Sequence, residues 1–385
     1  LSKMSSYAQE SFTGISVIKS YNIQDKIFSD FEYLSEESYR KNMSLAKLQA
    51  WFFPLMILLI GCSNLIVIYI GGYSYINNEI DIGVLAEFII YVNMLTWPVA
   101  VVGWVTSIIQ QAEASQKRIN EFLEEKPDIR NGKGVEGEIN GSIEFNNVSL
   151  LYPETNITAI NKINLKIPAG STIGIIGNIG SGKTSLLDLI VRFYDPVDGI
   201  IKVDGIDIKK YSLDQLRSSI SYVPQNAFLF SETIEKNIGY GLISSILKDI
   251  VEASKKAVVH KNIVSFLDGY QTILGERGVT LSGGQIQRVS IARAIIKNSK
   301  ILLLDDCLSA VDTNTEKEIL NHLKSFTKSK TTIIVSHRIS SLKHADQIIV
   351  FENGQIVQQG KHTDLMGVKG YYKELFEKQN TELSK

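Results

Sequence analysis

The chain has 385 residues and a formal net charge of −1, so its length allows two domains and its charge gives no sign of a nucleic-acid partner. Its two cysteines, Cys62 and Cys307, lie in an apolar run and beside paired aspartates, which excludes a disulfide-rich class. The first residues lack the pattern of a cleavable signal, and the chain does not begin with methionine. We therefore expect a piece of a longer protein.

The N-terminal region predicts a helical hairpin. Residues 10–47 alternate charged and apolar side chains at roughly helical spacing, as in a long helix that extends from a membrane into the cytosol. The stretch FTGISVIKS interrupts this pattern with Gly14 and a β-branched cluster, and predicts a short turn or cross-helix at the tip of the hairpin. An ordinary helix–turn–helix would give the same pattern.

Two charge-free segments follow, at residues 51–76 and 88–112, and each is longer than the roughly 20 residues that a bilayer span requires. The connector between them, NNEIDIG, carries only acids. Basic residues flank the pair on its outer sides: Arg40, Lys41, Lys47, Lys117 and Arg118. Because basic flanks stay in the cytoplasm, we predict two antiparallel spans with an external connector. The alternative is a pair of buried helices in a soluble domain.

Composition changes after the second span. Pro and Gly cluster with mixed charges at residues 126–141, which predicts a linker. From residue 142 the pattern becomes short β runs and then alternating strands and helices, which predicts a second domain over residues 142–380.

The second domain contains a phosphate-binding motif. In STIGIIGNIGSGKTSLLDLI an apolar strand leads into GNIGSGKT, which fits G-x-x-x-x-G-K-[ST], and then into a helix. Backbone N–H groups of such a loop surround phosphates, Lys183 would reach the β- and γ-phosphates of ATP, and the Thr184 hydroxyl would hold Mg²⁺. The predicted ATP contacts here are Gly177, Asn178, Ile179, Gly180, Ser181, Gly182, Lys183, Thr184 and Ser185.

Two further segments carry polar chemistry. The buried run ILLLDD ends in Asp305, which would hold Mg²⁺ beside the phosphates, although a strand-end aspartate can also cap a helix. Between the two motifs, LSGGQ opens a helix as a second anion-binding end, with Leu281, Ser282, Gly283, Gly284 and Gln285 as predicted ATP contacts. One active site hardly needs two such sites, unless the second serves a neighbouring chain.

The combination resembles the ATP-binding-cassette (ABC) transporter family. LSGGQ resembles its signature, YVPQNAFLF its Q-loop with Gln225, LGERG an exporter-specific loop, SAVD the D-loop, and IIVSHR the switch region with His337. Tyr152, in VSLLYPE, matches the aromatic residue that stacks on adenine, with plain packing as its alternative. For His337 the alternative is an exposed strand-end histidine.

The resemblance implies the fold and the partner. Residues 1–125 are similar to the last part of an exporter membrane domain, and the remainder is similar to an α/β P-loop NTPase cassette with antiparallel β and α-helical subdomains. About four of the usual six spans are missing or incomplete, so the chain resembles the C-terminal piece of a half-transporter; a genuine two-span protein is the alternative. Two cassettes would pair head to tail with a second half-transporter, homo- or heterodimeric, and hold ATP between the phosphate loop of one and the signature of the other.

The resemblance also assigns roles. Thr184, Gln225 and Asp305 would hold Mg²⁺, and His337 would contact the γ-phosphate and the attacking water. Asp306 stands where the family usually has a glutamate that polarises this water. The shorter side chain withdraws the carboxylate by about 1 Å, and such a misplacement costs on the order of 10²-fold in rate. We therefore expect slow hydrolysis at this chain's own site, as in one subunit of a heterodimer; a homodimer in which Asp306 suffices is the alternative.

The resulting prediction is an ATP-hydrolysing subunit of a multi-pass exporter in the cell inner (plasma) membrane, with a cytoplasmic cassette, contacts to membrane lipids and a hydrophobic substrate such as a lipid or a drug. A soluble cassette ATPase that acts on nucleic acid leaves the two charge-free segments unexplained. A further alternative is an ATP-gated regulator on the same fold, whose function would require the slow ATP turnover expected with Asp306.

Overall fold

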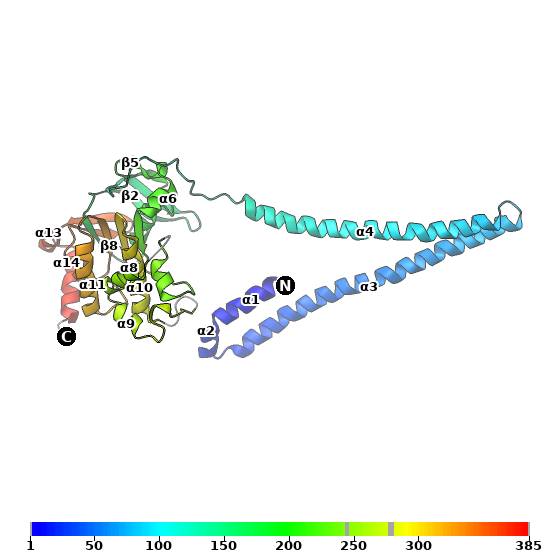
Figure 1. Cartoon of the computed structure of the whole chain (residues 1–385), viewed down its shortest axis with the longest axis horizontal. Coiled ribbons are helices and arrows are strands. Elements are labelled where there is room, and N and C mark those ends of the chain that lie inside the picture. The colour runs from blue at the N-terminus through cyan, green and yellow to red at the C-terminus, as the bar shows by residue number, and fades with distance from the viewer. Residues whose placement is uncertain (1, 243–245, 276–280, 384–385) are drawn as a thin grey trace. The chain divides into compact units, whose positions relative to one another are not determined.

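The computed structural model describes residues 2–242, 246–275 and 281–383. The chain divides into two compact units, Leu1–Lys126 and Pro127–Lys385. Figure 1 shows a helical first unit and a mixed α/β second unit.

The described part of the first unit consists of four helices: α1 (Ser2–Thr13), α2 (Ile15–Ser20), α3 (Gln24–Ile76) and α4 (Ile82–Glu124). The short α2 separates α1 from α3, and these two pack against each other, with a hydrogen bond from the Tyr7 hydroxyl to Asp30 at 3.3 Å. Helix α2 is thus the cross-helix predicted at the tip of the hairpin. Residues 21–23, which join it to α3, include Asn22 at a positive φ of 52°.

Helices α3 and α4 pack against each other and contain both charge-free segments (Figure 1). Each is long and apolar enough to cross a membrane, and the apolar windows are not buried inside the unit. Pro54 and Pro98 lie within the two helices and each removes one backbone hydrogen bond, a loss that membrane helices tolerate. The exposed apolar side chains are those expected of helices that meet lipid or further helices.

The second unit is built on two sheets. The antiparallel sheet has the order β2-β1-β4-β5, with strands β1 (Ile143–Tyr152), β2 (Ile157–Ile167), β4 (Asp198–Val203) and β5 (Ile206–Asp207). The larger sheet has the order β10-β9-β3-β8-β7-β6, with strands β3 (Thr172–Gly177), β6 (Ile220–Val223), β7 (Ile301–Asp305), β8 (Thr331–Val335), β9 (Gln347–Glu352) and β10 (Gln355–Gly360). All its neighbours are parallel except β9 and β10.

Helices pack on these sheets, most of them against the larger one. They are α5 (Lys183–Ile190), α6 (Leu213–Ser218), α7 (Ile234–Gly239), α8 (Leu247–Lys256), α9 (His260–Val264), α10 (Gly283–Lys297), α11 (Thr313–Phe326), α12 (Ile339–Leu342), α13 (His362–Gly367) and α14 (Tyr371–Leu383), with 3₁₀ turns η1 (Ile208–Lys210) and η2 (Gly269–Gln271). Helix α10 packs on α7 and α8, which gives the cassette its helical part.

Two cores hold these layers. One joins both sheets and α5 and includes Phe145, Leu186 and Leu303, all nearly fully buried. The other joins the larger sheet to α7, α8, α10 and α11. Because β3, β6, β7 and β8 are parallel, their carboxyl ends meet at one edge of the sheet, and the residues that follow them are brought together there.

Candidate nucleotide-binding site

The glycine-rich loop (residues 177–184) runs from the end of β3 into α5, as the motif predicts. Gly182 has φ +101°, a left-handed conformation, and a Cβ at this position would overlap the Ala159 carbonyl oxygen. Only glycine therefore fits at this entrance to the helix. The Ser181 carbonyl accepts a hydrogen bond of 3.0 Å from Gly354 N–H, which fixes the loop against the turn between β9 and β10.

Lys183 is folded into the loop. Its Nζ donates to the carbonyl oxygens of Gly177 at 2.9 Å and Asn178 at 2.6 Å, and its side chain is buried. Burial lowers the pKa of Lys183, and the charges of Asp305 and Asp306 oppose this shift. The Ser181 hydroxyl is a third, longer contact at 3.4 Å. A buried ammonium held only by neutral oxygens favours a stronger partner, and a phosphate would be one.

Thr184 and Asp305 meet at the edge of the sheet. The Thr184 Oγ1 donates to Asp305 Oδ2 at 2.9 Å, and the Tyr222 hydroxyl reaches the same oxygen at 3.5 Å. Burial raises the pKa of Asp305, and the nearby charge of Asp306 adds to this effect. The sequence motifs therefore bring a hydroxyl and a carboxylate together on a common edge.

These donors fit Mg²⁺. A hydroxyl that donates to a carboxylate keeps its lone pairs free for a metal, and hard oxygen ligands are those that Mg²⁺ prefers. Within the described residues no group of three or more His, Cys, Asp or Glu side chains could form a metal site by itself.

Two neighbours of Asp305 were not predicted from the sequence. Asp188 lies one turn after Thr184 on α5, and burial, with the charge of Asp305, raises its pKa to about 6. Tyr222, at the end of β6, donates toward both carboxylates, and burial raises its pKa as well. Asp188 could have been found from the sequence, because it lies four residues after Thr184 on the same helix. Tyr222 could not, because its contact with Asp305 depends on the packing of β6 beside β7.

Asp306 and His337 lie close together after β7 and β8. Asp306 is 9% exposed and has a positive φ of 42°, and its N–H donates to the Val335 carbonyl at 3.0 Å. Burial raises the pKa of Asp306, and the charge and the backbone N–H of His337 are the largest opposing influences. The second aspartate is therefore a buried acid beside the predicted switch histidine.

Tyr152 is half-buried at the end of β1. Its hydroxyl lies 2.9 Å from Ser185 Oγ, and its ring packs edge-on against Tyr194 with centroids 5.0 Å apart. The ring is thus fixed beside the phosphate-binding helix, where an adenine could stack on it. Ile179, at the tip of the loop, is 92% exposed.

Gln225 follows β6 in an exposed loop at the same edge of the sheet. The described residues give no hydrogen bond to its side chain, so the structure brings it to the edge without placing it on Asp305.

The signature segment (residues 281–285) lies at the start of α10. Ser282 caps this helix and forms a reciprocal capping box with Gln285, while Leu281 is buried. Gly284 packs closely on the D-loop, since a Cβ there would lie 2.8 Å from the Ala310 carbonyl oxygen. Across the described ranges no hydrogen bond joins this segment to the glycine-rich loop of the same chain. The predicted loop LGERG lies mostly outside the described residues.

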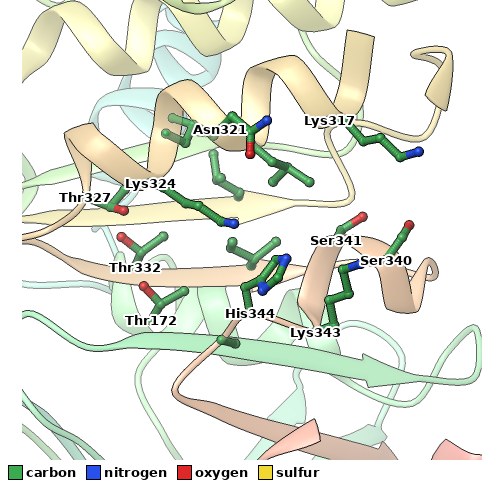
Figure 2. Close-up of a pocket in the computed structure, with 15 residues that line it drawn as sticks. Thr172, Lys317, Asn321, Lys324, Thr327, Thr332, Ser340, Ser341, Lys343 and His344 are labelled. Atoms are coloured by element: carbon green, nitrogen blue, oxygen red, sulfur yellow. The ribbon is translucent and has the colours of Figure 1, made fainter. Parts of the chain in front are cut away.

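A separate cavity of about 280 Å³ lies between α11, β8 and α12 (Figure 2). Its floor is apolar and its rim carries basic side chains: Lys317, Lys324, Lys343 and His344. None of the predicted ATP contacts lines it, so it is not part of the nucleotide site.

Comparisons with known proteins agree with this geometry. The family model for the ABC transporter matches residues 160–309, and that for the ABC transporter transmembrane region matches residues 1–99. The uncharacterised ABC transporter ATP-binding protein YknU of Bacillus subtilis is 41% identical over 98% of this chain and 65% of its own length. The multidrug resistance-like ATP-binding protein MdlA of Escherichia coli is 37% identical over 99% of this chain and 65% of its own length.

The structure of a bacterial Atm1-family ABC exporter with ATP bound superimposes with a TM-score of 0.89 at 28% identity, over 98% of this chain and 67% of that one. The chain thus spans 65% of the length of the two curated relatives named above. It belongs to the ABC transporter family and joins part of an exporter membrane region to an ATP-binding cassette.

Proposed function

We propose that the whole protein is an ATP-driven exporter of the cell inner (plasma) membrane, in which this chain supplies one cassette on the cytoplasmic side. The observation that carries the proposal is the contact of Thr184 with Asp305 at 2.9 Å beside the glycine-rich loop, on a chain with two helices apolar enough to span a membrane. A cassette fused to such helices can couple ATP binding to movement within the bilayer.

The ATP would lie between two chains. Ser282, Gly283 and Gln285 stand at the N-terminus of the 15-residue helix α10, where backbone N–H groups and the helix dipole favour an anion. Since the signature makes no described hydrogen bond to its own glycine-rich loop, it is free to meet the phosphates held by a second half-transporter.

Within one site the residues divide the work. The glycine-rich loop and Lys183 bind the phosphates, Tyr152 packs on adenine, and Thr184, Asp305 and Gln225 hold the metal. When bound, Mg²⁺ neutralises charge on the β- and γ-phosphates. Asp306 orients the attacking water, and His337 contacts the γ-phosphate.

Asp306 determines the rate of ATP hydrolysis that we expect at this chain's own site. Its carboxylate is buried beside His337 but one methylene shorter than a glutamate, so this chain's site binds ATP and hydrolyses it slowly. That supports a heterodimer in which the partner's site, completed by this chain's signature, does most of the hydrolysis. A homodimer in which Asp306 suffices is the alternative, and so is a regulator that uses ATP binding as a gate.

The substrate is proposed to be hydrophobic. Several relatives carry names that refer to multidrug resistance or multidrug export. The charge-free segments at residues 51–76 and 88–112 are mostly apolar, and the side chains of Asn93 and Thr96 bond to their own helix backbone. A lipid or a lipophilic drug would meet such a surface without losing hydrogen bonds to water.

The test is an assay of the full-length protein in proteoliposomes, with and without its candidate partner. We expect Mg²⁺-dependent ATP hydrolysis and ATP-dependent movement of a lipophilic dye, both abolished when Lys183→Ala is combined with the same change at the corresponding lysine of the partner. Turnover without transport would favour the regulator, and a wild-type protein that neither binds nor hydrolyses ATP would refute the proposal.

A further inference from the structure

The position of the His337 imidazole depends on the backbone that carries it. None of the hydrogen bonds given for the described residues involves this ring, and the side chain is only partly buried. If the ring is to meet a γ-phosphate, its direction depends on how the segment between β8 and α12 is held. We call residues 336–339 the switch loop.

The C-terminal helix holds this loop from one side. The Gln379 Nε2 donates to the His337 carbonyl oxygen at 2.7 Å, and the Gln379 Oε1 accepts from Ile339 N–H at 3.0 Å. One planar amide therefore bonds to the peptide groups on both sides of Arg338. The two contacts also fix the orientation of the amide, because its nitrogen must face a carbonyl and its oxygen an N–H.

Arg338 holds the loop from the other side. Its guanidinium donates to the carbonyl oxygens of Val311 at 3.2 Å and Ser309 at 3.4 Å, both in the D-loop segment. It also forms an ion pair with Glu316 on α11, a carboxylate that is 1% exposed. The side chain of Arg338 thus fixes the loop to α11. The backbone N–H of Arg338 donates to Ser336 Oγ at 3.0 Å and that of Ser336 to the Ile175 carbonyl at 3.1 Å, whereas the His337 carbonyl and the Ile339 N–H bond to Gln379.

We propose that Gln379 is a positioning residue for ATP hydrolysis, which holds the backbone of His337 so that the imidazole can reach the γ-phosphate. This inference rests on the proposed function. It makes α14 part of the support of the active site, although this helix contributes no residue to the nucleotide contacts named above.

The experiment compares full-length variants by their affinities for ATP and ADP in Mg²⁺. Gln379→Met removes both hydrogen bonds at similar volume, and Gln379→Glu keeps the acceptor for Ile339 N–H but loses the donor to His337. Gln359→Met, on the exposed face of β10, is the matched control. We expect both Gln379 variants to lose about three- to tenfold of their preference for ATP over ADP, with ADP affinity unchanged.

Amide exchange gives a second readout that does not depend on turnover. The peptide that contains Ile339 exchanges faster in Gln379→Met than in the wild type, and stays protected in Gln379→Glu and Gln359→Met. An equal loss of ATP and ADP affinity would mean that Gln379 only supports the fold, which overturns the inference. Gln379 variants that bind and exchange like the control overturn it too.

The two proposals fail in different ways. A wild-type protein without ATP turnover contradicts the proposed function. The role of Gln379 is then still decided by two comparisons of the Gln379 variants with the wild type: the ratio of ATP to ADP affinity, and the amide exchange of Ile339. A Gln379→Met protein that transports normally and keeps the wild-type preference for ATP over ADP leaves the proposed function intact and refutes the positioning role.

Discussion

The Thr184 hydroxyl donates to Asp305 at 2.9 Å, although 121 positions separate the two residues in the chain. The contact forms because β3 and β7 both pair with β8 in one parallel sheet, so that the residues following them share an edge. Everything proposed for the nucleotide site depends on this edge.

Replacement of Asp306 by glutamate tests the slow site. Asp306→Glu extends the carboxylate by one methylene toward the water, so we expect ATP turnover by the full-length protein, assayed without a partner, to rise by about 10- to 100-fold. The measurement is a steady-state phosphate-release assay at saturating Mg-ATP. An unchanged rate in Asp306→Glu would contradict the weak-site interpretation. A wild-type protein purified without a partner that hydrolyses ATP as fast as Asp306→Glu would favour the homodimer.

Asp188 predicts a pH dependence of stability in metal-free buffer. Its pKa in the folded protein is raised to about 6, so the protein gains stability from this group at low pH and loses it as pH rises through 6. Asp188→Asn should therefore raise the unfolding temperature at pH 7.5 and leave it unchanged near pH 4.

The expected gain is on the order of 1 kcal/mol once solvent screening of this partly exposed group is allowed for. Thermal unfolding in EDTA across this pH range provides the measurement. A variant that is equally stabilised at both pH values would show that the charge of Asp188 is not the cause.

Two neighbouring glycines of the signature should differ in the effect of an added methyl group. Gly284→Ala places a Cβ 2.8 Å from the Ala310 carbonyl oxygen, whereas at Gly283 the nearest atom lies at 3.8 Å, an ordinary contact. Gly284→Ala should cost about 1–3 kcal/mol of unfolding free energy through overpacking, and Gly283→Ala much less. Chemical denaturation of both variants measures the difference, and similar losses would refute the close approach of α10 to the D-loop.

The sequence predicted the architecture well because its motifs are local. The glycine-rich loop, the strand before Asp305 and the capped start of α10 are each encoded within a dozen neighbouring residues, and the cross-helix α2 follows from one interrupted pattern. The order of strands in the larger sheet was not predicted, because no local pattern of residues encodes it.

The contacts that support the site were not predictable in this way. Gln379 lies 42 positions from His337, and Tyr222 lies 83 positions from Asp305, so only packing of distant elements reveals them. Gln379 has no distinctive neighbourhood in the sequence, and Tyr222 opens YVPQNAFLF, a motif that was chosen for Gln225 alone. The left-handed backbone of Asp306 is likewise imposed by its tertiary surroundings, since its N–H bonds to β8.

The closing of two cassettes around ATP is the central claim, and a distance measurement tests it most directly. Leu267 is fully exposed, and Cys62 is the exposed native cysteine while Cys307 is buried, so Leu267→Cys in a Cys62→Ser background gives one accessible label on this cassette, to be paired with one label on the second cassette. Spin-label distances between this cassette and the second one in the full-length transporter should change and narrow to one population when Mg-ATP is added with turnover blocked. Identical distance distributions with and without Mg-ATP would contradict the account.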